Sequence, residues 1–163
     1  MKKILNGRSL LAICVTASML FLLSSTLWAQ KPLGMAEGET PGVRVEVTEL
    51  KRVSGGMLNL KFVMINDSDQ KVGFGYSFAD RDHEVIDISS IGGVHLIDAV
   101  GKKKYFVIRD SEKKCVCSAK LKDLQPKSRM NLWAKFPAPP DDAQKITVVI
   151  PHFQPIDDVP ISR

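Results

Sequence analysis

Apolar and polar residues alternate along several short stretches of the chain, which is the pattern of half-buried β-strands. In 43–50 and in 130–136, apolar residues recur at every second position. The stretch 57–65 alternates in the same way, but Val63 and Ile65 on its second face are apolar too. We therefore predict that 57–65 is a central strand, partly covered on both sides.

Turn signals separate these strands. Ser54–Gly56 predicts a tight turn, so that 43–50 and 57–65 form a β-hairpin, and Asn66–Asp69 predicts the next turn. The segment 79–93 has weak periodicity and many charges, which indicates a loop that holds at most a short strand at 85–88. Further strands are predicted at 71–78, 94–99, 105–109 and 146–150, with a short edge strand at 157–161.

The pattern gives about seven to eight short antiparallel strands, and no stretch of ten residues beyond the first 29 keeps a helical period. Such a series of strands predicts an all-β domain, most simply a β-sandwich. An open or closed barrel has the same number of strands and stays an alternative.

The first 29 residues predict a cleaved bacterial signal peptide. Lys2, Lys3 and Arg8 precede an apolar run over 10–23, and Ala29 offers a small residue at the cleavage position. Polar residues end the run before it reaches the length of a membrane span, so no stable span is expected after cleavage. The large residue before Cys14 argues against lipidation there. The protein is thus expected to be periplasmic or secreted.

Residues 30–42 have two prolines, three glycines and no periodic pattern, which predicts a flexible tail before a single domain at 43–163. Loss of the three basic leader residues lowers the formal net charge from +5 to +2. A charge this small, together with export, argues against nucleic acid as a partner.

Four segments of the second half of the chain form a recognisable set: the strand Tyr105–Asp110, the sequence Cys115–Ser118, Phe136–Pro140 and the closing Asp158–Ile161. In these segments the chain resembles a group of exported bacterial immunoglobulin-like domains. Some members stand alone, and others precede a peptidoglycan-binding domain similar to that of outer membrane protein A. The resemblance implies an immunoglobulin-like β-sandwich in the cell envelope and adds little about mechanism.

Cys115 and Cys117 are the only cysteines after the leader. In an oxidising compartment two such residues tend to pair. In an extended strand, residues two apart have Cα atoms about 6.5 Å from each other, so a disulfide requires a bend at Val116. A local cross-link is the leading interpretation. A redox-active pair and a metal site that uses the two thiolates remain alternatives.

A copper or zinc site would need more ligands than two thiolates, and His95 and His152 are the candidates. The carboxylates of Asp80–Asp87 recur at spacings found in calcium loops, but the turn glycine is missing, which favours a solvated acidic loop. Trp133 lies on the outward face of its strand. It is either a contact residue or a residue that covers a second sheet.

No nucleophile elbow, zinc-protease motif or phosphate loop occurs in the sequence, so no enzymatic activity and no cofactor are expected. The sequence favours a non-catalytic binding or accessory module of the cell envelope, whose partner is an envelope protein or a cell-wall component. The alternative is a periplasmic metal-binding or redox-linked protein that uses Cys115 and Cys117.

The leader yields a direct prediction. Cleavage after Ala29 should leave a mature protein that begins at Gln30, which amino-terminal sequencing of the exported protein would show. An intact Met1, or a lipid on Cys14, would contradict it.

Overall fold

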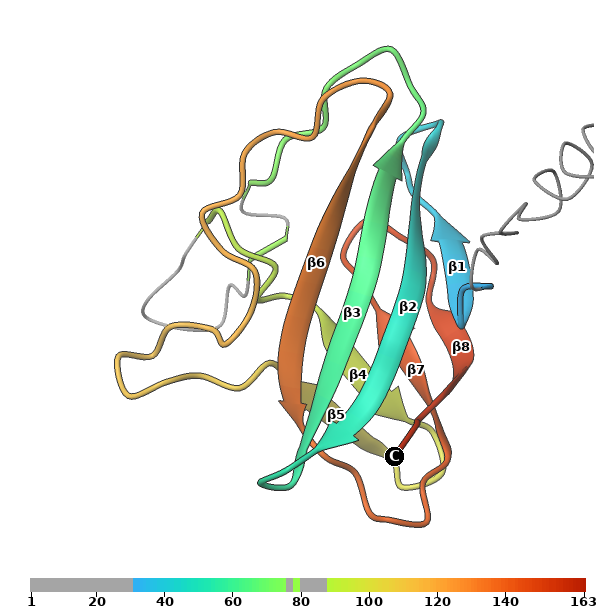
Figure 1. Ribbon diagram of the computed structural model, residues 1–163, viewed down its shortest axis with the longest axis vertical. Coiled ribbons are helices and arrows are strands. Elements are labelled where there is room, and N and C mark those ends of the chain that lie inside the picture. Colours follow the sequence, from blue (N-terminus) through green and yellow to red (C-terminus); the bar gives the residue numbers. More distant parts are fainter. Residues whose placement is uncertain (1–30, 76–77, 80–87) are drawn as a thin grey trace, which may run out of the picture. The chain divides into compact units, whose positions relative to one another are not determined.

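The fold consists of two four-stranded antiparallel sheets packed face to face. The computed structural model describes residues 31–75, 78–79 and 88–163. One sheet has the order β1-β2-β3-β6 and the other the order β5-β4-β7-β8, and Figure 1 shows the first in front of the second. The first sheet contains β1 (Gly34–Glu37), β2 (Val43–Val53), β3 (Met57–Asn66) and β6 (Ser128–Pro137). The second contains β4 (His95–Asp98), β5 (Lys103–Phe106), β7 (Lys145–Val149) and β8 (Ile156–Pro160).

This strand order is that of an immunoglobulin-like sandwich. Strands β2, β3 and β6 take the positions of strands A, B and E, and β4, β7 and β8 take those of C, F and G. Strand β5 pairs with β4 and therefore belongs to the second sheet. The predicted all-β sandwich is confirmed, with β1 as an additional strand.

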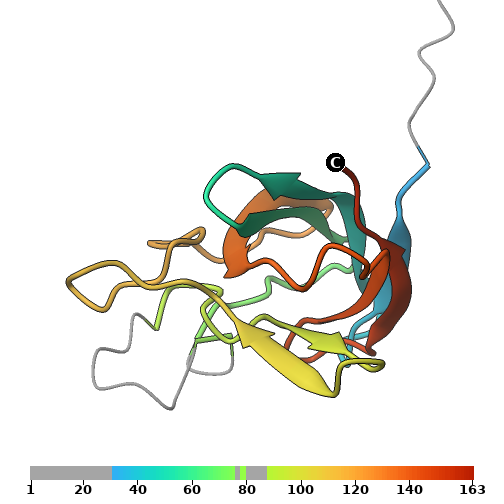
Figure 2. The ribbon, with the colours of Figure 1, turned by 90° about the horizontal axis from the view of Figure 1, so that it is seen from below.

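Strand β3 is the centre of the first sheet. It pairs with β2 on one side and, without interruption from Met57 to Asn66, with β6 on the other. Alternate β3 residues point into the core and are fully buried, as the hydrophobic pattern predicts: Leu58, Leu60, Phe62 and Met64. Seen from below in Figure 2, the second sheet lies as a separate layer opposite the first.

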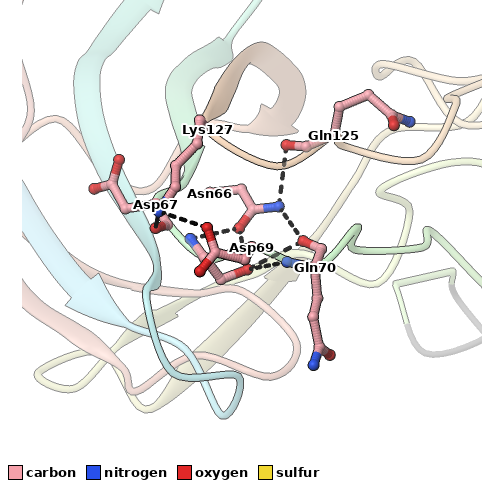
Figure 3. A network of polar contacts seen from close by, with 7 residues as sticks. Asn66, Asp67, Asp69, Gln70, Gln125 and Lys127 are labelled. Carbon is pink, nitrogen blue, oxygen red and sulfur yellow. Dashed lines mark hydrogen bonds and ion pairs between the residues drawn. The ribbon is translucent and has the colours of Figure 1, made fainter.

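The buried amide of Asn66 fixes the end of β3. Its Nδ2 donates hydrogen bonds to the carbonyl oxygens of Gln70, Leu124 and Gln125, and its Oδ1 accepts from Ser68. Figure 3 shows the contacts of Asn66 with Gln70 and Gln125, together with Lys127 reaching across to the turn after β3. A fully buried amide must satisfy its hydrogen bonds, so Asn66 holds the loop before β6 against the end of β3.

Two expectations for the strands were wrong. Residues 34–37, placed in a flexible tail, form β1, in which Ala36 is buried and Gly34 packs against Ile156 of β8. Strand β1 is held by main-chain pairing with β2, which requires no alternating pattern, so the sequence gives no signal for this strand.

The predicted strand 71–78 is reduced, among its described residues, to a single bridge between Val72 and Leu124, because Gly73 and Gly75 weaken strand formation. The short strand expected near 85–88 falls almost entirely outside the described residues.

The contact between β1 and β8 can be tested with glycine substitutions. A Cβ atom on Gly34 would overlap Cγ2 of Ile156, whereas one on Gly75 would meet nothing within 4 Å. Gly34→Ala should therefore lower the free energy of unfolding by about 1–3 kcal/mol through overpacking. Gly75→Ala, the matched control, should change it by no more than about 0.5 kcal/mol. Equal denaturant midpoints for both variants would mean that β1 does not pack against β8 in solution.

Candidate functional site

The segment Cys115–Ser118 lies along the outer edge of β6. Ser118 N donates to the carbonyl of Trp133 at 2.9 Å, and Lys135 N donates to the carbonyl of Val116 at 3.0 Å. The hydroxyl of Ser118 accepts a further bond from Trp133 N at 3.0 Å. The segment thus occupies the outward main-chain groups of Trp133 and Lys135, which an edge strand would otherwise expose.

A tight turn brings this segment to the edge. The carboxylate of Asp110 accepts hydrogen bonds from the amides of Glu112 and Lys114, and Lys113 has a φ of 63°. Arg109 and Cys115 then face each other as an antiparallel bridge. The polar sequence between them is therefore a turn, as the sequence predicts.

The sulfur atoms of Cys115 and Cys117 lie at disulfide-bonding distance, 2.01 Å apart. The chain bends at Val116, and the two Cα atoms are 5.3 Å apart, closer than in an extended strand. Cys117 is buried against the core, while Cys115 is half-buried. This geometry agrees with the local cross-link expected from the sequence.

The two candidate histidines make other contacts. The ring of His95 packs beside Phe106, and burial lowers the pKa of His95 below its usual value. Nδ1 of His152 lies 2.8 Å from the carboxylate of Glu39, and its ring packs on Phe78. Across residues 31–75, 78–79 and 88–163, no three His, Cys, Asp or Glu side chains gather in a metal-binding arrangement. The acidic segment Asp80–Asp87 lies outside the described residues.

Trp133 points away from the core, as predicted, and is 40 % exposed on the outer face of the first sheet. It lies opposite Lys61 of β3, which in turn lies opposite Glu49 of β2. A hollow of about 250 Å³ opens beside the indole; besides Trp133 it is lined by Thr48, Asn59, Lys61, Phe62, Asn131 and Leu132. Phe62 and Leu132 are core residues, so the open walls are the polar side chains and the indole.

A β-bulge shapes the far wall of this hollow. The pairing of β2 with β3 shifts between Val47 and Glu49, which leaves Thr48 as the extra, exposed residue. Its hydroxyl donates to the carbonyl of Lys61 at 3.2 Å. A regular strand would bury residue 49 after Val47. The extra residue instead leaves both Thr48 and Glu49 outside the core and returns Leu50 to it.

One carboxylate anchors the polar wall. Glu49 accepts a hydrogen bond of 2.9 Å from the amide of Asn59 and pairs with the ammonium group of Lys61 at 3.1 Å. These contacts lower the pKa of Glu49 below its usual value, the bond from Asn59 being the largest cause. Glu49 therefore stays ionised and holds two of the side chains that line the hollow.

A larger hollow of about 530 Å³ lies between the β4–β5 turn and β7. Its buried carboxylate, Asp98, accepts hydrogen bonds from the amides of Val100 and Gly101. Because these amides use the carboxylate to build the turn, we regard Asp98 as structural.

Comparison of the chain with protein-family models, curated proteins and solved structures finds no match. Within the part of the chain that the structure describes, no helix is long and apolar enough to cross a membrane. The site must therefore be interpreted from its own geometry.

Trp133 and the two cysteines were recognisable in the sequence, but the residues that form the hollow with Trp133 were not. Asn59 and Asn131 stand at outward positions of predicted strands, which was the available signal. Their proximity to Thr48 depends on strand register and on the bulge, which the local pattern does not specify.

The cysteine pair gives a second test by mutation. Replacement of both Cys115 and Cys117 by serine should leave the fold intact and lower the free energy of unfolding by about 1–3 kcal/mol, because the closed loop is very short. Thermal melts with and without Cu(I) or Zn(II) should be unaffected by metal in both proteins. Metal-induced stabilisation that is lost in the double variant would favour the metal-site alternative instead.

Proposed function

We propose that this protein is an exported, non-catalytic binding or accessory module of the bacterial cell envelope. The predicted leader supports export. The immunoglobulin-like sandwich supplies a rigid frame on which a surface site can be held. The partner is an envelope protein or a cell-wall component that contacts the outer face of the first sheet.

The single observation that carries this proposal is the exposed indole of Trp133 beside a polar hollow. Apolar residues on the opposite face of the same sheet are sealed in the core, so the sheet does not need Trp133 for its own packing. Tryptophan is enriched among residues that dominate binding energy, because it combines a large apolar area with a hydrogen-bond donor. Partial exposure of such a residue favours a contact surface.

The short distance between the sulfur atoms of Cys115 and Cys117 supports a structural role for the Cys115–Ser118 segment rather than a role in metal binding or redox chemistry. Two sulfur atoms at bonding distance offer no free thiolate as metal ligand or nucleophile. The segment that contains them bonds to the main chain of Trp133, so we assign it to positioning the edge of β6.

The proposal predicts that Trp133 retains the protein in the envelope. Trp133→Ala, introduced in the full chain with its leader, should weaken partner binding by about 30-fold, the loss typical of a central tryptophan. The washed envelope fraction should then contain much less of the protein than for the unmodified chain, with equal export judged by immunoblot.

Phe106→Ala is the matched control, because Phe106 is the large aromatic residue exposed on the outer face of the other sheet, at 48 %. It should leave envelope retention unchanged. Equal retention of both variants would refute a role for the Trp133 face, provided that both melt at the temperature of the unmodified protein.

A further inference from the structure

We propose that the hollow beside Trp133 binds an acidic polysaccharide, with a sugar ring stacked on the indole and its carboxylate directed to the surrounding lysines. This inference rests on the proposed function and names the ligand class of the same site. It follows from the composition of the hollow, its charge and the state of the adjacent strand edge.

The side chains around the hollow match the groups of a sugar. A pyranose ring presents C–H groups on its faces and hydroxyls around its rim. A site that binds it therefore combines a flat apolar surface with short polar side chains around that surface. The indole of Trp133 supplies the flat apolar surface. Asn59 and Asn131 supply amides, and Thr48 supplies a hydroxyl oxygen that can accept, since its proton is donated to the carbonyl of Lys61.

Part of this hydrogen-bonding capacity is unused. The amide of Asn131 makes no side-chain hydrogen bond to any other described residue, and Asn59 uses Nδ2 for Glu49 while Oδ1 has no such partner among them. These groups can therefore bond a ligand without breaking contacts that hold the fold. The hollow of about 250 Å³ is large enough for a single sugar ring.

The charge of the surface favours an acidic ligand. Lys61 lies directly opposite Trp133, and the next outward row holds Lys135, Asn59 and Lys51 across β6, β3 and β2. Glu49 is the acidic residue in these two rows, and its charge is already shared with Lys61 and Asn59. Lys135 and Lys51 thus add net positive charge on one side of the hollow. On the other side, Glu46 in the row of Asn131 is paired with Arg44, so the net charge complements a carboxylate on the ligand.

The strand edge argues against an acidic peptide. An extended peptide usually binds a sheet by adding a strand to its edge. Here Val116 and Ser118 already bond to Trp133 and Lys135 on the edge of β6. A ligand at the hollow must therefore lie on the face of the sheet, where side chains and not main-chain groups recognise it.

Trp133 is the only tryptophan after the leader, so its fluorescence reports on the hollow. Titration of the processed, exported protein with tetragalacturonate should change the emission in a saturable way, with a dissociation constant of about 1 mM or below. Maltotetraose, which is neutral, and tetraglutamate, an acidic peptide, should bind at least about tenfold more weakly. Added salt should weaken the binding of tetragalacturonate.

Two variants test the assigned contacts. Lys61→Met should weaken tetragalacturonate binding about tenfold, since it removes a charged hydrogen-bond donor and leaves Glu49 without its cation. Lys103→Met, the matched control on β5, removes the same charge from the other sheet and should change binding by less than about twofold. Asn131→Ala should also weaken tetragalacturonate binding, by about fivefold, and this loss does not depend on the ion pair between Glu49 and Lys61.

Several results would overturn the inference: no saturable change with tetragalacturonate, equal binding of maltotetraose, equal or tighter binding of tetraglutamate, or Lys61→Met and Asn131→Ala both behaving like the control. Retention in the envelope that depends on Trp133 without saccharide binding would leave the proposed function standing and reject only the polysaccharide. Failure of both experiments would reject both.

Discussion

The pairing of β3 with its two neighbours is the constraint on which the rest of the structure depends. Every second residue of β3 enters the core, so its register with β2 and β6 decides which side chains are sealed and which face solvent. A shift by one residue would bury Lys61 and expose Leu60 and Phe62. The same register sets Trp133 opposite Lys61, which means that the core and the hollow are two consequences of one alignment.

The edges of the first sheet are closed by different means. At one edge β1 pairs with β2 and contacts β8 of the second sheet, where Gly34 allows close approach to Ile156. At the other, the Cys115–Ser118 segment bonds to the main chain of β6. Covered edges protect a sandwich against pairing with other chains. They also leave the outer face of the sheet as the surface that is available to a ligand.

Local pattern predicted most of the fold, because alternating burial records which strand face meets the core. It failed where main-chain pairing or tertiary contact decides the structure. Strand β1 has one buried apolar side chain, Ala36. A single buried residue cannot produce an alternating pattern, so the sequence does not indicate this strand. The cysteine pair and Trp133 were recognisable by residue type. Their neighbours in space were not, since the contact of Ser118 with Trp133 and the bulge at Thr48 arise from long-range register.

The Cys115–Ser118 segment covers the edge of β6 at Trp133 and Lys135, and we propose that it thereby directs a partner to the face around Trp133. Amide hydrogen exchange of the processed protein, measured residue by residue, tests this cover most directly. We expect strong protection of the amides of Lys135 and Ser118, which donate to Val116 and Trp133, respectively, in the structure. Exchange of these amides at the rate of an open strand edge, in a protein whose β3 amides are protected, would contradict it.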